Sequence, residues 1–195
     1  MKVTLISPYL DAMALGLRGL SSFLKEQGVE CEMIFLPDYK SLLRDEPDFV
    51  KRFPDSLLDD VVHACAESDL VGISLMSNYF DRGLYLTRAI KSALKVPVVW
   101  GGIHPTLAPE ASLDYCDIVC VGEGELPMLN LARAMERKQE IRSIRGLWFK
   151  DDGKVIMNEP EPLILDLDAL PFQDFDFKDH YSVDEAGEHL SLIHI

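Results

Sequence analysis

The stretch Val96-Pro97-Val98-Val99-Trp100-Gly101-Gly102-Ile103-His104-Pro105-Thr106 carries the clearest structural signal in this chain. Its first part is a short apolar run rich in valine, which is typical of a buried strand. The paired glycines that follow remove every side chain from the carboxyl end of that strand. In an open α/β sheet, ligands bind outside these carboxyl ends. The stretch therefore predicts a strand that leads into a ligand-binding turn, with room for a large flat or phosphate-bearing molecule.

Apolar runs and amphipathic segments alternate on both sides of this stretch. The expected strands are residues 2–7, 29–36, 70–75, 96–100 and 117–121. The expected helices are residues 10–27, 56–67, 81–94, 109–113 and 125–137. Strands that are separated by helical crossovers form a mostly parallel sheet with helices on both faces. The sequence thus predicts an α/β fold, a doubly wound, flavodoxin-like or Rossmann-like sheet of five strands.

The pattern changes after Lys138. Two strand-like runs, 144–150 and 154–157, flank an Asp-Gly turn that is typical of a β-hairpin. A proline-rich segment with many leucines and phenylalanines follows, and prolines prevent long regular elements there. We expect a ligand-binding domain over residues 1–140, a hairpin and linker strap over 141–180, and the truncated start of a further domain over 181–195.

Composition limits the classes of partner. The chain has 195 residues, 48% of them hydrophobic, and a net charge of −14. Phosphate-rich partners need clustered Lys and Arg, so we expect neither nucleic acid nor an anionic membrane surface as a partner. The apolar runs are far shorter than the ~20 residues of a membrane span, and the first residues lack the layout of a secretory signal. We therefore expect a cytoplasmic protein.

The four cysteines do not have the spacing of a metal site. They are Cys31, Cys65, Cys116 and Cys120, and none belongs to a Cys/His group with zinc spacing. We expect four buried thiols.

Small and polar residues follow four of the expected strands. Hydroxyl and amide groups there can bond a ligand, backbone N–H groups at helix starts accept negative charge, and glycines admit bulk. No Ser-His-Asp arrangement or basic phosphate clamp accompanies them, which favours binding over catalysis. The candidate binding residues are Ser7, Tyr9, Ser74, Met76, Ser77, Asn78, Gly101, Gly102, His104, Thr106, Gly122, Glu123 and Gly124.

Two of these candidates have an equally simple structural explanation. His104 either contacts the ligand at the rim or packs between Ile103 and Pro105 with a protein partner. Glu123, like Glu125, either contacts the ligand or interacts with the unpaired N–H groups and the dipole of the helix that follows.

Three segments together resemble the N-terminal cobalamin-binding domain of cobalamin-dependent radical S-adenosylmethionine enzymes. They are Ile73-Ser74-Leu75-Met76-Ser77, then Val98 to Thr106, then Asp117-Ile118-Val119-Cys120-Val121-Gly122-Glu123-Gly124-Glu125. The linker over residues 163–177 is similar to the strap that leads into the radical barrel of these enzymes. The combined pattern is more specific than any of its motifs alone.

The resemblance implies that a corrinoid lies across the carboxyl edge with its nucleotide tail beside the sheet. Ser74 would contact the tail, and Met76 stands where the family usually has leucine. The pairs Gly101-Gly102 and Gly122/Gly124 would make room for the tail. Many cobalamin carriers have D-x-H-x-x-G after the first strand, but residues 7–16 contain no histidine. We therefore expect base-off cobalamin without a histidine ligand.

A second departure from the family concerns catalysis. The C-x-x-x-C-x-x-C motif that binds the [4Fe–4S] cluster and S-adenosylmethionine is absent. We expect residues 181–195 to be the start of a missing radical SAM barrel, and the chain alone to bind cobalamin without catalysing a reaction. The complete enzyme would transfer a methyl group or perform a related rearrangement.

Three other functions fit the same fold less well. A phosphoacceptor receiver domain needs acidic residues at the first strand's end and an Asp at the third, where this chain has Ser7-Pro8 and Ser74. A dinucleotide-binding domain needs G-x-G-x-x-G directly after the first strand, and Gly16 and Gly19 come too late. A non-catalytic ligand-binding or protein-interaction module stays the main alternative.

Overall fold

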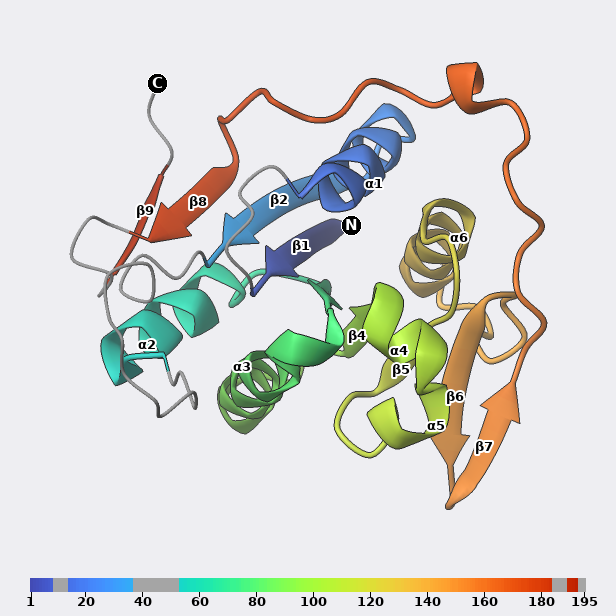
Figure 1. Cartoon of the computed structure of the whole chain (residues 1–195), viewed down its shortest axis with the longest axis horizontal. Coiled ribbons are helices and arrows are strands. Elements are labelled where there is room, and N and C mark those ends of the chain that lie inside the picture. The colour runs from blue at the N-terminus through green and yellow to red at the C-terminus, as the bar shows by residue number, and fades with distance from the viewer. Residues whose placement is uncertain (9–13, 37–52, 184–188, 193–195) are drawn as a thin grey trace.

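One mixed sheet runs through the whole computed structural model, which describes residues 1–8, 14–36, 53–183 and 189–192 (Figure 1). In this part of the chain the strand order is β7-β6-β5-β4-β3-β1-β2-β8-β9. The strands are β1 (Lys2–Ser7), β2 (Glu30–Phe35), β3 (Leu70–Ser74), β4 (Val98–Gly101), β5 (Ile118–Cys120), β6 (Leu147–Asp151), β7 (Lys154–Met157), β8 (His180–Val183) and β9 (Leu190–Leu192).

The five central strands are parallel and have the order β5-β4-β3-β1-β2. This is the flavodoxin-like order, in which the chain reverses direction across the sheet between β1 and β3. Most residues of these strands are buried, as expected for a sheet that is covered on both faces. The predicted α/β fold is confirmed.

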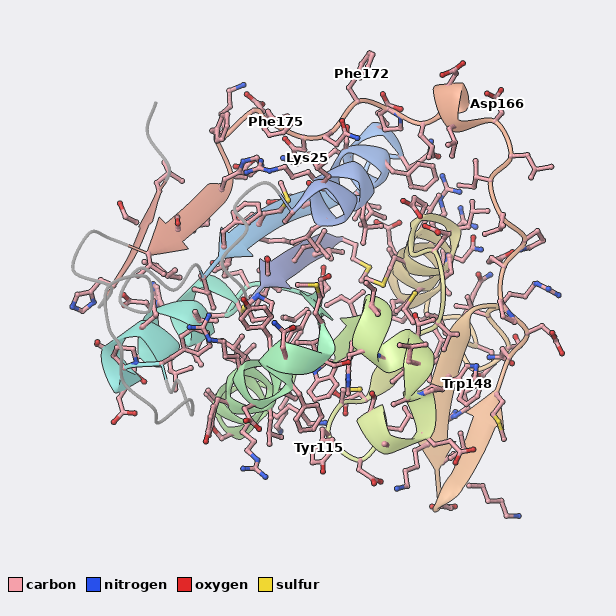
Figure 2. All side chains as sticks on the ribbon, viewed as in Figure 1. Lys25, Tyr115, Trp148, Asp166, Phe172 and Phe175 are labelled. Carbon is pink, nitrogen blue, oxygen red and sulfur yellow. The ribbon has the colours of Figure 1, made fainter. Side chains whose placement is uncertain are left out.

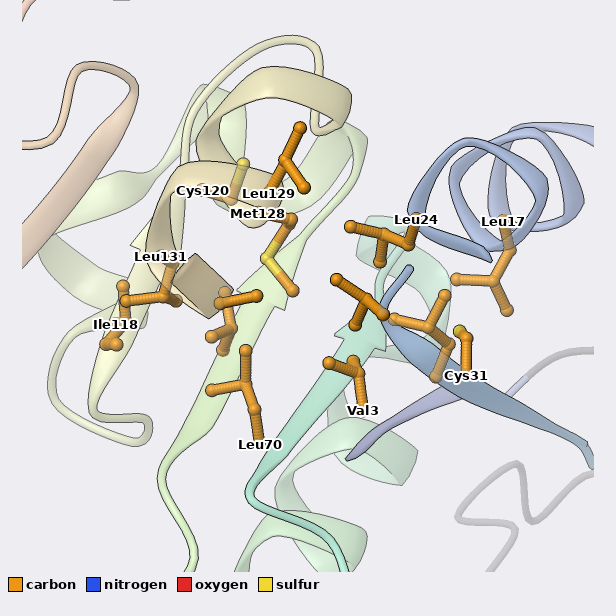
Figure 3. Close-up of a cluster of buried hydrophobic side chains, with 14 of the residues drawn as sticks. Val3, Leu17, Leu24, Cys31, Leu70, Ile118, Cys120, Met128, Leu129 and Leu131 are labelled. Carbon is orange, nitrogen blue, oxygen red and sulfur yellow. The ribbon is translucent and has the colours of Figure 1, made fainter. Parts of the chain in front are cut away.

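Two layers of helices enclose the sheet (Figure 1). On one face, α1 (Leu15–Glu26) and α6 (Glu125–Glu136) pack over a core that includes Val3, Val99 and Ile118. Figure 3 shows this core, with Leu17 and Leu24 of α1 opposite Met128 and Leu131 of α6. The other face is covered chiefly by α2 (Asp55–Ala64) and α3 (Phe80–Ala93). Short helices follow β3 and β4: a 3-10 helix at Ser77–Tyr79, then α4 (Ile103–Leu107) and α5 (Pro109–Ser112).

The predicted hairpin exists, but it extends the main sheet instead of standing beside it. Strand β6 pairs antiparallel with β5, and its Leu147 and Phe149 enter the same core. On the opposite side β8 pairs parallel with β2, and β9 pairs with β8. These additions cover strand edges that a five-stranded sheet would leave unpaired. The described part of residues 181–195 thus belongs to this sheet.

The strap, residues 158–179, runs from β7 past α6 and α1 to β8 (Figure 1). Apart from the single 3-10 turn at Leu167–Ala169 it has no helix or strand. Several of its apolar side chains point to solvent: Leu165 is 92% exposed and Phe172 is 94% exposed. Figure 2 shows Phe172 and Phe175 along this segment above α1.

The strap is fastened to α1 by Asp174. The Ser21 hydroxyl donates a hydrogen bond of 2.7 Å to the carboxylate of Asp174, and Lys25 Nζ lies 2.9 Å from the same oxygen. Arg18 Nη1 donates to the Asp174 carbonyl at 2.7 Å. The buried guanidinium of Arg18 also lies 4.5 Å from the centre of the Phe35 ring.

All four cysteines are buried free thiols, as predicted. Burial raises the pKa of each thiol to about 12. Within the residues that the structure describes, no helix has the length and apolar character needed to cross a membrane.

Candidate functional site

A slot opens at the carboxyl edge of the sheet and runs down between the sheet and the helices α1 and α6. Its volume is about 360 Å³. The floor comes from β1, β3, β4 and β5, and the walls come from Leu17 and Leu20 of α1 and Met128 of α6. The site lies where open α/β sheets bind their ligands. The lining residues are Leu5, Ala14, Leu15, Gly16, Leu17, Leu20, Gly72, Ile73, Ser74, Met76, Val99, Gly101, Gly102, Cys120, Gly122, Glu123, Gly124, Glu125 and Met128.

Strand register divides the floor into two rows. In the inner row, Leu5 pairs with Gly72 and Gly72 pairs with Val99. In the outer row, Ser74 pairs with Gly101, which has Cys120 as its neighbour on β5. Side chains two residues apart on a strand point to the same face, so both rows face the slot.

Gly72 allows the inner end of the slot to close. A Cβ atom at Gly72 would lie 2.9 Å from Leu5 Cδ2 and 3.6 Å from Met128 Cε. Because the glycine has no side chain, these two apolar groups meet over it and form the bottom of the slot. Sequence reasoning missed Gly72 as a site residue, although its position two residues before Ser74 places both on one face.

The adjacent glycines of the turn after β4 have different roles. Gly102 has a φ of 94°, and a Cβ there would lie 2.9 Å from the carbonyl oxygen of Leu75. This close approach lets His104 N donate to that same carbonyl at 3.0 Å, which joins the turn to the end of β3. A Cβ at Gly101 would meet only Cys120 Cβ, at an ordinary 3.7 Å. Gly102 is therefore required by the backbone, whereas Gly101 keeps the slot open.

The turn between β5 and α6 forms the outer rim. Gly122 has a φ of 85° and open space where a Cβ would stand. Its N–H donates to Thr106 Oγ1 at 3.1 Å, so Thr106 ties this turn to α4. Glu123 is exposed at the rim. Burial raises the pKa of Glu125 and the charge of Glu123 adds to the rise, while backbone N–H groups at the start of α6 oppose it.

A second group of predicted residues lies at the same edge but outside the slot lining. His104 Nδ1 lies 3.1 Å from Ser77 Oγ, and its ring centre is 5.1 Å from that of Phe80. Asn78 is exposed on the adjoining 3-10 helix. His104 thus has protein partners, as one of its two interpretations required, and its contact with a ligand stays a prediction.

Ser7 and Tyr9 complete the predicted set. Ser7 is fully buried at the end of β1, and its hydroxyl has no hydrogen-bond partner among the described residues. Because Ile6 pairs with Ile73, Ser7 lies beside Ser74 on the slot face of the sheet. Tyr9 falls outside the described residues.

The structure therefore brings seven of the predicted residues into one slot. These are Ser74, Met76, Gly101, Gly102, Gly122, Glu123 and Gly124. Sequence reasoning missed the apolar lining, chiefly Leu5, Leu20, Val99 and Met128, because nothing in a sequence separates such residues from ordinary core.

Arg82 was also missed, and it organises the neighbouring part of the carboxyl edge. This buried residue of α3 donates from Nη1 to the Pro8 carbonyl at 2.9 Å and to the Leu36 carbonyl at 3.3 Å. It thereby holds the chain where it leaves β1 and β2. The guanidinium lies 4.8 Å from the centre of the Phe53 ring. These protein contacts give Arg82 a structural role at this edge.

A flavodoxin-like sheet with a slot at its carboxyl edge defines the class of α/β small-molecule-binding domains. Comparison with known protein families narrows this class. The B12 binding domain family matches residues 1–132. The chain belongs to this family.

Curated relatives share this part of their sequence. The chain is 31% identical over 157 residues to an uncharacterized methyltransferase of Pyrococcus horikoshii, a match that covers 74% of this chain and 34% of that protein. It is 28% identical over 120 residues to the anaerobic magnesium-protoporphyrin IX monomethyl ester cyclase of a Synechocystis strain, covering 58% of this chain and 23% of the relative. The chain thus spans about a third or less of the length of these relatives.

Two solved enzymes share the fold. The radical S-adenosylmethionine methyltransferase TsrM from Kitasatospora setae, solved with tryptophan substrate and a SAM analogue, aligns with a TM-score of 0.65 at 21% identity, over 83% of this chain and 30% of that one. The cobalamin-dependent S-adenosylmethionine radical enzyme OxsB aligns with a TM-score of 0.69 at 19% identity, over 90% of this chain and 24% of that one.

Proposed function

We propose that the slot takes the nucleotide tail of cobalamin in the base-off form, with the corrin ring resting over the carboxyl edge. The observation that carries this proposal is the position and lining of the slot, which pairs an apolar interior with Ser74 and bare glycine backbone at its outer end. Family membership supports the same ligand. When bound, cobalamin supplies a cobalt centre that can carry a methyl group.

The residues present fit this group. The slot lies near the lower end of the ~300–1,000 Å³ typical of small-molecule pockets. It would accommodate the tail and leave the much larger corrin ring at the rim. Gly101 and Gly124 provide the width, because a Cβ at Gly101 would contact only Cys120, and one at Gly124 would make only ordinary contacts with Leu20 and Met128. The Ser7 hydroxyl, which has no hydrogen-bond partner among the described residues, and the Ser74 side chain are the polar groups closest in register to this opening.

The whole protein's activity is part of the proposal. We infer that the chain is the cobalamin-binding part of a radical SAM enzyme, a methyltransferase or a related enzyme. In such an enzyme the [4Fe–4S] cluster and S-adenosylmethionine would be held by residues that this chain does not contain. A non-catalytic interaction module is the second candidate, and the exposed Leu165 and Phe172 of the strap favour it.

The first test is direct binding. The purified chain is mixed with hydroxocobalamin, desalted, and its visible spectrum recorded. We expect corrinoid to co-elute with the protein and to show the spectrum of the displaced-base form. A spectrum with a histidine nitrogen on cobalt would overturn the proposed ligation. A colourless, folded protein would overturn cobalamin binding and favour the interaction module.

A matched pair of variants ties binding to the slot. Gly101→Leu places a side chain in the opening, so we expect the retained corrinoid to fall at least tenfold. Gly19→Leu makes the same substitution on α1 at a position with no neighbouring atom within 4 Å and outside the slot lining. This control should retain wild-type binding. Equal binding by both variants would show that the corrinoid is held elsewhere.

A further inference from the structure

We infer that the inner end of the slot selects the base of the corrinoid tail, accepting an alkylated benzimidazole and disfavouring a purine. The inference rests on the proposed function and adds a specificity to it. It follows from which atoms line the bottom of the slot and how completely they are buried.

The solvent exposure of the lining residues decreases from the rim of the slot to its inner end. At the rim, Gly102, Gly122 and Glu123 are exposed. At the inner end, the relative exposure is 1% for Leu5, 1% for Val99 and 2% for Met128. A ligand group that reaches the inner end is therefore fully desolvated.

The inner end offers apolar side-chain contacts. Leu5, Val99 and Met128 carry no nitrogen or oxygen in their side chains, and the apolar Leu20 lines the wall nearer Gly124. Leu5 and Met128 meet over Gly72 and close the bottom. The thioether of Met128 suits an aromatic ring, because sulfur makes favourable contacts with ring edges.

Polar groups are confined to the outer half. Ser74 and the backbone of Gly101 lie in the outer row, and Glu123 and Glu125 lie at the rim. Two buried polar side chains also lie in the outer row: the thiol of Cys120, which is a weak hydrogen-bond partner, and the hydroxyl of Ser7 beside Ser74. The slot thus matches a ligand with a polar stem and an apolar end, such as a ribose phosphate that carries an alkylated aromatic base.

A purine base would be penalised at this end. A displaced benzimidazole has one free ring nitrogen, whereas adenine has further ring nitrogens and an exocyclic amine. These extra polar groups would lose their water without gaining a side-chain partner, and unsatisfied buried polar groups are costly. Apolar pockets reject polar analogues of similar size by up to about 100-fold. We therefore expect an adenine-bearing cobamide to bind about 10–100-fold more weakly than cobalamin.

The test compares three corrinoids on the purified 195-residue chain by visible titration: cobalamin, the adenine-bearing cobamide, and cobinamide, which lacks the nucleotide tail. We expect cobalamin to bind tightest and the other two more weakly. Equal binding of cobalamin and the adenine-bearing cobamide, with weaker cobinamide, would overturn base selection and leave the proposed function intact. Equal binding of all three corrinoids would show that the slot does not bind the nucleotide tail. If none of the three bound, the proposed function itself would be wrong.

A pair of methionine variants on α6 assigns the selectivity to the slot. Met128→Gln introduces an amide of similar length at the inner end, so we expect the preference for cobalamin over the adenine-bearing cobamide to fall below about threefold, because the amide can bond the purine. Met135→Gln changes the same residue type on the same helix outside the slot lining and should keep the full preference. An unchanged preference in Met128→Gln would contradict the inference. If that variant does not fold, the three-corrinoid comparison on the wild-type chain decides alone.

Discussion

Gly101 and Gly102 have the same chemistry and adjacent positions, but their surroundings give them opposite tasks. At Gly102 the backbone adopts a left-handed φ and passes within contact distance of the end of β3. At Gly101 the missing side chain faces the slot. Gly102 therefore allows the backbone of the turn to fold, and Gly101 keeps the slot open.

This difference predicts separate effects of one substitution. Gly102→Ala forces a Cβ to 2.9 Å from the Leu75 carbonyl at an unfavourable φ, so we expect it to lower the free energy of unfolding by about 1–3 kcal/mol. Gly101→Ala makes only an ordinary contact and should change that free energy by less than about 0.5 kcal/mol. Urea denaturation followed by circular dichroism measures both. Equal losses in the two variants would contradict the assignment of roles.

The same scale shows how far the sequence alone can lead. The turn glycines and Ser74 could be predicted as site residues, because glycines and polar residues directly after buried strands are unusual and indicate a binding turn. Leu5 and Met128 could not, because their side chains are typical of core and only the folded register aims them at the slot. Thr106 was expected near a ligand, which stays a prediction; the sequence did not show that its Oγ1 also accepts a hydrogen bond from the Gly122 N–H. Such local bonds depend on which turns meet across the sheet.

At the scale of elements, helix α1 contacts the slot with one face and the strap with another. Leu17 and Leu20 form a wall of the slot, and Ser21 and Lys25 hold Asp174 of the strap (Figure 2 labels Lys25 and the neighbouring Phe175). Because the strap holds α1 from the outer side, it helps to keep Leu17 and Leu20 in position at the slot. The strap therefore supports the wall of the slot without lining it.

Asp174→Asn tests this support. The change removes the charge that pairs with Lys25, and charge-assisted hydrogen bonds contribute more than neutral ones. We expect a loss of about 1–2 kcal/mol in the free energy of unfolding at pH 7, measured by urea denaturation. Asp176→Asn is the control, because this neighbouring carboxylate is exposed and pairs only with the exposed Lys178 in the described part of the chain. A matching loss in the control would show a general charge effect.

The pH dependence of this loss follows from the pKa of Asp174. Burial raises that pKa, but the bonds from Lys25, Ser21 and the Asp176 N–H outweigh burial and hold it well below the usual range. A carboxyl whose pKa is lower in the folded state adds stability above its unfolded pKa of ~3.9, and this stability disappears as the pH falls below that value. Burial lowers the pKa of His180, and Asp174, 3.4 Å from its Nε2, opposes this lowering, so the carboxylate also favours the protonated histidine as the pH falls. The difference between wild type and Asp174→Asn should therefore be at least as large at pH 5 as at pH 7. A difference that shrinks between these two values would contradict the sign.

At the scale of the whole molecule, the sequence predicted the parallel centre better than its borders. Five apolar runs with helical crossovers permit few arrangements, and the flavodoxin-like order is one of them. The sequence analysis expected the hairpin to follow a five-stranded sheet and residues 181–195 to begin a further domain, and it did not predict β8. A strand pattern shows that a segment is extended but does not identify the strand with which it pairs. Leu147 and Phe149 settle the partner by entering the core beside Ile118.

The two tryptophans of the chain can show whether this sheet unfolds as one unit. Trp100 is fully buried in β4, and Trp148 lies on β6 of the hairpin (Figure 2). In Trp148→Phe only Trp100 reports by fluorescence, and in Trp100→Phe only Trp148 does. Each variant is compared with its own far-ultraviolet circular dichroism, so that a change in overall stability, such as loss of the Trp100 Nε1 bond to Thr87, cancels.

We expect coincident urea transitions in both variants, because β6 is hydrogen-bonded to β5 and shares its core, and a cooperative unit gives one midpoint by every probe. If Trp148 reported an earlier transition than circular dichroism, the hairpin would be an independent unit, and the division at residue 140 that the sequence pattern predicts would hold. Coincidence would instead extend the cooperative domain to the hairpin. The slot would then depend on the hairpin for its stability, because β5, which contributes Cys120 to the floor of the slot, pairs with β6.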